Sequence, residues 1–242
     1  MKGCVLCDME EQQNRFATMI TNDKTKCVYH NPILFETENF YLTIDLHPIS
    51  DCHYLIVPKM HYTSYSLIPK KYEVELNFLI KLIKEKNDVE NFILFEHGSG
   101  FINETLVGCG NSVFHAHMHF IGKLKYDSNK ILKIMSLSGI NLKELSIKTI
   151  ERNNSLLQII ITNNDKCYNT PYLFLKFNDT ECLIMLERDK IKIQSQFFRK
   201  MFSEEINGKG CFWNWKDIIE QNDKTVLQER IIKMITRFKV EK

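Results

Sequence analysis

The chain of 242 residues carries 32 basic and 30 acidic side chains, so its formal net charge is only +2. This near-neutral balance argues against a nucleic-acid or membrane-surface partner, and a hydrophobic fraction of 44% argues against a disordered chain. The length suits one large domain, or one domain with a sizeable extension, and is sufficient to bury a core without disulfides.

The N-terminal segment MKGCVLCDMEEQQNR contains acidic side chains and no apolar run, so it is not a signal peptide. No segment of the chain approaches the roughly 20 apolar residues of a membrane helix. We therefore expect a soluble protein of the cytoplasm. Among the eight cysteines, only Cys4 and Cys7 form a close CxxC pair. In a reducing compartment such a pair indicates metal or redox use rather than a disulfide.

The first half of the chain predicts short strands around one long helix. The strand segments are rich in β-branched and aromatic residues, and the helix segment has apolar residues at helical spacing. This order predicts an α+β fold in which an antiparallel sheet carries the helix on one face. The expected elements are two strands within 32–45 that turn near Glu38 and Asn39, a strand at 53–59 that ends at Pro58, the helix at 70–86, and strands at 91–100 and 112–121.

After Lys123 the pattern changes to an extension of mixed strands and helices. Its elements are separated by polar turns, without an internal repeat or a low-complexity linker. Two tryptophans, Trp213 and Trp215, are expected in its core. The predicted elements are a helix at 127–139 with Asp127 or Ser128 as N-cap, strands at 155–162, 171–177 and 181–187, and helices at 195–205 and 222–239.

Three histidines stand at alternate positions in NSVFHAHMHFIGK: His115, His117 and His119. In a strand, alternate side chains share a face, so the three would point one way and the apolar residues between them would point into the core. Three imidazoles on one face can bind a metal, hold a phosphate, or supply a nucleophile whose neighbours tune it. All eight histidines lie at or before position 119, so we expect the chemistry in the first half.

HAHMHFI fits the H-φ-H-φ-H-φ-φ motif of the histidine triad (HIT) superfamily, and further landmarks are similar in the same order. CVLC resembles the N-terminal CxxC of zinc-bearing bacterial members, and HYLIVPKMH looks like their strand with a downstream PKxH. FEHGSG and GCGNSVFHAH are similar to a bacterial subgroup with the same glycine loop, and SQFFRK and WNWK are similar to its C-terminal region. The resemblance implies a HIT-like catalytic domain at 1–124 and an α/β extension at 125–242 packed on it.

The resemblance also implies roles for the triad and for the loop before it. His117 matches the nucleophile that attacks the α-phosphate while a backbone carbonyl holds its other ring nitrogen. His119 would donate to phosphate oxygens or to the bridging atom, and His115 completes the triad. The loop residues that would bind phosphate are Gly110, Asn111 and Ser112, although many relatives have a longer glutamine at the Asn111 position.

Two residues match positions near the nucleotide's sugar. Asp45 matches the acid that accepts hydrogen bonds from ribose hydroxyls, and the alternative is a turn aspartate before HPIS. His53 would line the site or cap its strand. Glu96 and His97 belong to the glycine-loop motif, and no role is predicted for them.

The resemblance implies a structural zinc ion beside the triad. Two thiolates and two imidazoles suit tetrahedral zinc, and four protein ligands leave the metal no part in the reaction. A rival ligand set keeps the two cysteines and replaces His61 and His115 by Cys27 and His30, which follow zinc-knuckle spacing. The third alternative is that the chain binds no metal. The implied ligands are Cys4, Cys7, His61 and His115.

The function implied is hydrolysis or nucleotidyl transfer at an α-phosphate through a nucleotidyl-histidine intermediate. Dinucleoside polyphosphates and nucleoside phosphoramidates are the implied substrates, and relatives are often homodimers. The alternative is a catalytically weak nucleotide-binding or protein-interaction module with a structural zinc. The intact triad favours the enzyme, whereas the long extension partly favours the module.

Overall fold

The computed structural model describes most of the N-terminal half of the chain and parts of the C-terminal half. The described residues are 4–20, 31–99, 115–123, 129–130, 133, 136, 146–149, 171–177, 181–186, 196–208 and 225–239. The helices with defined bounds are α1 (Met9–Ile20), α2 (Glu73–Asn87), α6 (Phe197–Asn207) and α8 (Thr225–Phe238), with 3-10 turns η2 (Tyr65–Leu67) and η3 (Lys70–Tyr72). The strands are β1 (Ile33–Glu36), β2 (Phe40–Ile44), β3 (His53–Pro58), β4 (Phe92–Gly98), β5 (Met118–Gly122), β6 (Ser146–Thr149), β7 (Tyr172–Phe177) and β8 (Glu181–Leu186).

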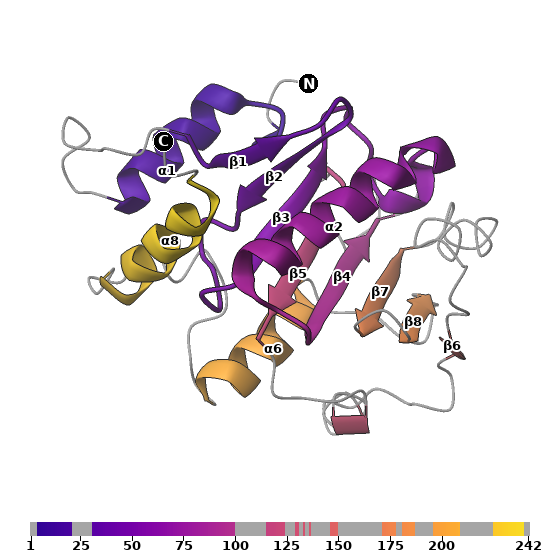
Figure 1. Ribbon diagram of the computed structural model, residues 1–242. Coiled ribbons are helices and arrows are strands. Elements are labelled where there is room, and N and C mark those ends of the chain that lie inside the picture. Colours follow the sequence, from indigo (N-terminus) through magenta and orange to yellow (C-terminus); the bar gives the residue numbers. More distant parts are fainter. Residues whose placement is uncertain are drawn as a thin grey trace.

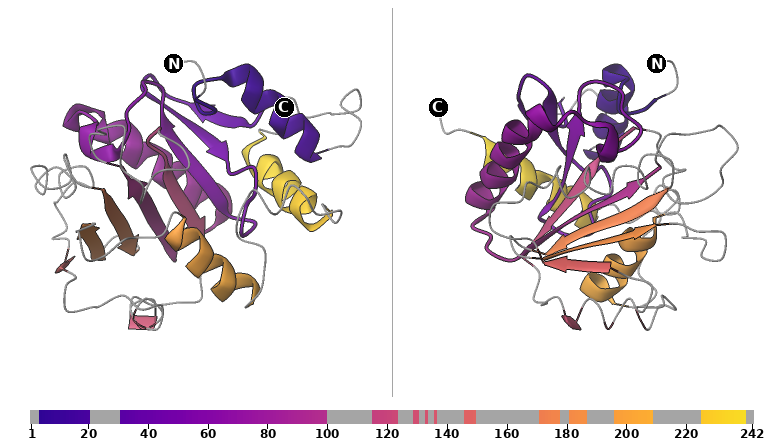
Figure 2. Two further views of the ribbon diagram at one scale, coloured as in Figure 1. Left: turned by 180° about the vertical axis from the view of Figure 1, so that it is seen from behind. Right: turned by 90° about the vertical axis from the view of Figure 1, so that its right-hand side faces the viewer.

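The strands with defined bounds form one antiparallel sheet in the order β1-β2-β3-β5-β4-β7-β8-β6. Helices α2 and α8 lie on one face of this sheet and α6 lies on the other (Figure 1, Figure 2). Strands β7, β8 and β6 continue the sheet beyond β4. The predicted α+β class, with a helix on one face of an antiparallel sheet and an α/β extension, is therefore confirmed.

Alternate apolar residues of the central strands and one face of α2 build the main core. Phe92 and Leu94 of β4 point to the same face as Phe120 of β5, and the Phe92 and Phe120 rings stack with centroids 5.0 Å apart. Burying one such side chain contributes about 1.5–3 kcal/mol. Because the strands alternate, the opposite face of the same two strands carries Phe95 and His119. From α2 the core receives Leu76, Leu79, Ile80 and Ile83.

The predicted strand at 112–121 is wrong at its start, because β5 begins only at Met118. Its first three predicted residues lie outside the described part of the chain, and the next three are not in a strand. Continuing the register of β3 and β5 would bring Pro58 opposite Ala116, and proline has no N–H to donate. The amide of Ala116 instead donates to the carbonyl of Tyr62 (2.7 Å). Only the last histidine of the triad therefore lies in a strand.

The apolar residues between the histidines are buried in the main core, as predicted. Most other predicted elements that fall on described residues are also confirmed, within about three residues at each end. Strand β6 was not predicted, because SIKT is short and half polar. The predicted strand at 155–162 and the two tryptophans lie outside the described residues, and residues 129, 130, 133 and 136 of the predicted helix at 127–139 are helical. In the part of the chain that the structure describes, no helix has the length and apolar composition needed to cross a bilayer.

Glu96 ties the extension to the rest of the sheet. Its side chain is buried, and its carboxyl oxygens accept hydrogen bonds from the amide of Tyr65 (2.7 Å) and the hydroxyl of Tyr172 (2.6 Å). Tyr172 begins β7, and a Cβ at Gly98 would overlap its ring, so glycine permits this close approach. Burial raises the pKa of Glu96 to about 8.

We expect Glu96 to make the protein less stable as the pH rises from about 5 to about 8. The native state keeps a proton on Glu96 up to about pH 8, whereas the unfolded chain releases it near pH 4.5, so the free energy of unfolding falls across this window. Glu96→Gln stays neutral and should remove up to about 1.4 kcal/mol of this loss per pH unit. Denaturant unfolding of both proteins across the window measures the two slopes. Equal slopes would contradict a protonated Glu96.

Candidate active site

His117 lies immediately before β5, with one ring nitrogen anchored by the backbone. Its Nδ1–H donates to the carbonyl oxygen of His115 (2.7 Å). A neutral imidazole carries one proton, so Nε2 of His117 keeps an unshared electron pair. Burial lowers the pKa of His117 below its ordinary value, which favours the neutral ring at pH 7. The ring therefore presents one nitrogen that can act as a nucleophile.

Hydrogen bonds from β3 determine where His119 carries its proton. The amide of Ile49 donates to Nδ1 of His53 (3.2 Å), so the proton of neutral His53 is on Nε2. That Nε2 lies 2.8 Å from Nδ1 of His119, and it therefore donates to His119. Burial lowers the pKa of His53 to about 4 and that of His119 well below its ordinary value. Neutral His119 thus carries its proton on Nε2, and its ring stacks on Phe95 with centroids 4.4 Å apart.

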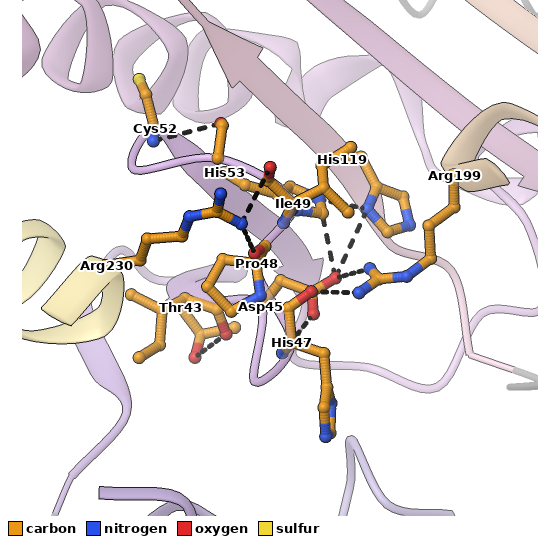
Figure 3. Close-up of polar contacts among 12 residues, drawn as sticks. Thr43, Asp45, His47, Pro48, Ile49, Cys52, His53, His119, Arg199 and Arg230 are labelled. Atoms are coloured by element: carbon orange, nitrogen blue, oxygen red, sulfur yellow. Dashed lines mark hydrogen bonds and ion pairs between the residues drawn. The ribbon is translucent and has the colours of Figure 1, made fainter. Parts of the chain in front are cut away.

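Asp45, just after β2, lies in a cluster of cationic and imidazole groups (Figure 3). One carboxylate oxygen accepts a hydrogen bond from the amide of His47 (2.8 Å), and the other lies 2.6 Å from Nη1 of Arg199. The second oxygen is also 3.5 Å from Nε2 of His53 and 3.8 Å from Nδ1 of His119. Burial alone would raise the pKa of Asp45, but the Arg199 guanidinium and the hydrogen bond from the His47 amide hold it below its ordinary value. Asp45 is therefore an ionised carboxylate inside the site.

Helix α6 of the extension contributes directly to this cluster. Its Arg199 pairs with Asp45 and also donates from Nη2 to the carbonyl oxygen of His47. The amide of Phe198, in the first turn of α6, donates to Nε2 of His97 (3.2 Å). His97 therefore supplies an acceptor to the helix start, where backbone amides have no partner within the helix. His97 of the glycine-loop motif thus attaches the extension, as Glu96 also does.

The sequence marks Arg199 only as one of several basic residues in the extension. A usable signal is helical spacing, because Arg199 is buried together with Phe198, Phe202 and Ser203 on one side of α6. A charged residue on the buried side of a helix requires a partner, because an unpaired charge is costly to bury. The partner itself could not be found locally, because Asp45 is 154 residues away.

Two cysteines and two histidines converge next to the triad. The ligand atoms of Cys4, Cys7, His61 and His115 all lie within 4.8 Å of one another. Nδ1 of His115 is 3.5 Å from Sγ of Cys4 and 3.3 Å from Sγ of Cys7, and Nδ1 of His61 is 3.2 Å from Sγ of Cys7. Tetrahedral zinc, with Zn–S of about 2.3 Å and Zn–N of about 2.0 Å, places sulfur and nitrogen ligands about 3.5 Å apart. These four residues therefore fit zinc.

The backbone prepares His115 for metal binding. Its Nε2–H donates to the carbonyl oxygen of Pro58 (2.7 Å), which leaves Nδ1 without a proton and directed at the two thiols. Metal-ligating histidines are commonly oriented by such a hydrogen bond from the other ring nitrogen. His115 thus serves two neighbours, since its side chain faces the cysteines and its carbonyl anchors His117.

Five candidate metal-ligating or phosphate-binding residues lie outside the described part of the chain. Two of them belong to the rival metal set and three to the loop expected to bind phosphate. Their contributions stay predictions, as do the domain boundary at residue 124, the homodimer and the cytoplasmic location. The five are Cys27, His30, Gly110, Asn111 and Ser112.

Comparisons with known proteins find a HIT domain in this chain. The family model of the HIT domain matches residues 27–126. An uncharacterized HIT-like protein of Methanocaldococcus jannaschii is 27% identical over 113 residues, which cover 47% of this chain and 84% of the relative. An uncharacterized HIT-like protein of Mycoplasma genitalium is 26% identical over 155 residues, covering 64% of this chain and 92% of the relative.

Solved structures of HIT proteins also match. One is a HIT family hydrolase from Clostridium thermocellum, which is 21% identical with a TM-score of 0.35, over 52% of this chain and 96% of that one. The segment that the family model matches, residues 27–126, contains the triad, the PKxH motif and Asp45. It does not include the CxxC pair or the chain beyond residue 126. Residues 27–126 of this chain thus match the HIT domain of the histidine triad superfamily.

Proposed function

We propose that this chain is a nucleotide hydrolase or nucleotidyl transferase that reacts at an α-phosphate through a covalent nucleotidyl-histidine. The observation that carries the proposal is the hydrogen bond from Nδ1–H of His117 to the carbonyl oxygen of His115, which leaves Nε2 free of a proton. Dinucleoside polyphosphates and nucleoside phosphoramidates are the proposed substrate classes, because both carry a leaving group on an α-phosphate.

The proposed reaction has two displacements at phosphorus. In the first, Nε2 of His117 forms a bond to the α-phosphorus while the bond to the leaving oxygen or nitrogen breaks, and His119 gives its Nε2 proton to the leaving atom. In the second, water or another hydroxyl attacks phosphorus, the bond to His117 breaks, and His119 recovers a proton from the attacking group. Both histidines then return to their starting protonation states.

We also propose a structural zinc ion bound by the two cysteines, His61 and His115. Four protein ligands leave no open coordination position, so the metal would supply cross-linking and no chemistry. It would join the N-terminal segment to the end of β3 and to the segment before β5. Leu6, between the two cysteines, already packs there against Tyr41, Leu55 and Val57 in a small core.

Intact-protein mass spectrometry tests the covalent intermediate. After brief incubation with adenine and guanine phosphoramidates or dinucleoside polyphosphates, the wild-type protein should gain the mass of one nucleotidyl group. Because a phosphorus–nitrogen bond to histidine is labile in acid, the adduct should survive a neutral quench and disappear in an acid quench. If no adduct forms and no mononucleotide is released with any substrate, the binding-module alternative replaces this proposal.

A further inference from the structure

Asp45, whose resemblance to the ribose-binding acid of HIT proteins implies contact with a sugar, is engaged in an ion pair with Arg199. Nη1 of Arg199 is 2.6 Å from Oδ2 of Asp45, and Oδ1 of Asp45 accepts a hydrogen bond from the amide of His47 (2.8 Å). The side chains of Asp45 and Arg199 are only 11% and 5% exposed. Both carboxylate oxygens are therefore already bonded within the protein, in a region with little access for solvent.

We infer that Arg199 takes the carboxylate that would otherwise accept hydrogen bonds from sugar hydroxyls, so that the site uses ribonucleotides and 2′-deoxyribonucleotides alike. The inference rests on the proposed function, because it concerns substrate recognition at the same site. A sugar hydroxyl would have to compete for this carboxylate with a buried charged donor, whose hydrogen bond to a carboxylate is roughly twice as strong as a neutral one. Nε2 of His53 and Nδ1 of His119 lie 3.5 Å and 3.8 Å from Oδ2 of Asp45, so little space remains for a sugar hydroxyl beside that oxygen.

The extension holds Arg199 in this position through several contacts with the segment that follows Asp45. The second guanidinium nitrogen of Arg199 donates to the backbone of the segment that follows Asp45. Farther along the same segment, Nδ2 of Asn207 donates to the carbonyl of Ile49 (2.9 Å), and Nη1 of Arg230 donates to the same carbonyl (3.2 Å). Figure 3 shows Arg199 and Arg230 reaching this segment from two different helices. The pair is thus built into the contact between α6, α8 and the HIT domain.

The group of Asp45, His53 and His119 could in principle hold a metal ion instead. The guanidinium at 2.6 Å from the carboxylate opposes a cation there, because it already supplies the positive charge. The two histidines are also joined by a direct hydrogen bond of 2.8 Å, which uses the nitrogens that a metal would need. An ion pair between Arg199 and Asp45 therefore fits the observed contacts better than a second metal does.

The test compares kcat/KM for adenosine 5′-phosphoramidate with kcat/KM for its 2′-deoxy form. We expect the wild-type ratio to lie within about threefold of one, because Arg199 engages the carboxylate that would accept a hydrogen bond from the 2′-hydroxyl. Arg199→Met removes the partner of Asp45 and should raise the ratio about tenfold in favour of the ribonucleotide. Arg199→Lys keeps the positive charge, so its ratio should stay near that of the wild type. Arg230→Met is the matched control, because Arg230 contacts the same segment without touching Asp45, and it should leave the ratio unchanged.

A wild-type preference for the ribonucleotide above about tenfold, unchanged in Arg199→Met, would overturn the inference. Calorimetric binding of adenosine monophosphate and its 2′-deoxy form to the wild-type protein gives the same comparison if Arg199→Met does not fold. Similar Kd values support the inference, and a tenfold tighter ribonucleotide overturns it. A nucleotidyl adduct with strong ribose preference defeats this inference alone, whereas no adduct with any nucleotide defeats the proposed function as well.

Discussion

Replacing His117 with alanine is expected to lower kcat for nucleoside phosphoramidate hydrolysis by roughly 10⁴-fold to 10⁶-fold, as removal of a covalent nucleophile does. The change removes the only imidazole ring of the triad in which Nδ1–H is anchored and Nε2 is unprotonated. This ring lies next to that of His119, the proposed proton donor. The substitution also removes the nucleotidyl adduct. Single-turnover kinetics with mass spectrometry of the quenched protein measures both effects.

The matched comparison is His119→Ala, which keeps the nucleophile and removes the expected acid. That variant should still form an adduct, at a rate reduced by about 10²-fold to 10⁴-fold. Nucleotide binding to His117→Ala, measured by calorimetry, should stay within about tenfold of the wild type, because the ring is needed for chemistry more than for affinity. Near-normal turnover by His117→Ala would remove the covalent mechanism.

Combining Cys4→Ser with His61→Ala is expected to reduce bound zinc from about one ion per chain to almost none. The two changes remove one sulfur and one nitrogen from a set whose sulfur–nitrogen separations fit tetrahedral zinc. Loss of the cross-link should lower the apparent Tm by roughly 10 °C. Activity should fall as well, because the side chain of His115 faces the metal site and its carbonyl oxygen anchors His117. Elemental analysis and a thermal scan measure the two effects.

The control for the metal site is the rival pair. Cys27→Ser combined with His30→Ala should retain a full equivalent of zinc, and Cys52→Ala, which alters a buried cysteine outside the cluster, should retain it too. If the Cys27 and His30 variant loses its zinc while the Cys4 and His61 variant keeps it, the ligand set proposed here is wrong. Zinc absent from the wild type purified without chelator would exclude the site altogether.

Local patterns were sufficient for most of the elements that the structure describes. Runs of β-branched and aromatic residues that end at proline or glycine predict strands such as β3, and apolar residues at helical spacing predict α2 and α8. Each of these patterns is local in the sequence. The start of β5 could not be predicted in this way. It depends on Pro58, whose missing N–H interrupts the ladder from a different strand.

Motif order was likewise sufficient to select the candidate ligands and the triad. CxxC, PKxH and HxHxH each contain residue types that match one chemistry, so Cys4, Cys7, His61 and His115 could be selected before their distances were available. The proton positions were not predictable. They depend on single contacts such as the hydrogen bond from His115 to the carbonyl of Pro58, which a sequence does not encode locally.

The sequence by itself thus determined the HIT motifs, the α+β class and the identity of the histidines, because these depend on residue types at short spacing. Only the tertiary structure decided that the extension enters the active site. Arg199 reaches Asp45 across 154 residues, and Tyr172 reaches Glu96 across 76. Such contacts depend on which strands become neighbours and on which face a helix packs. Those choices are determined by the free energy of the whole fold and not by any local pattern.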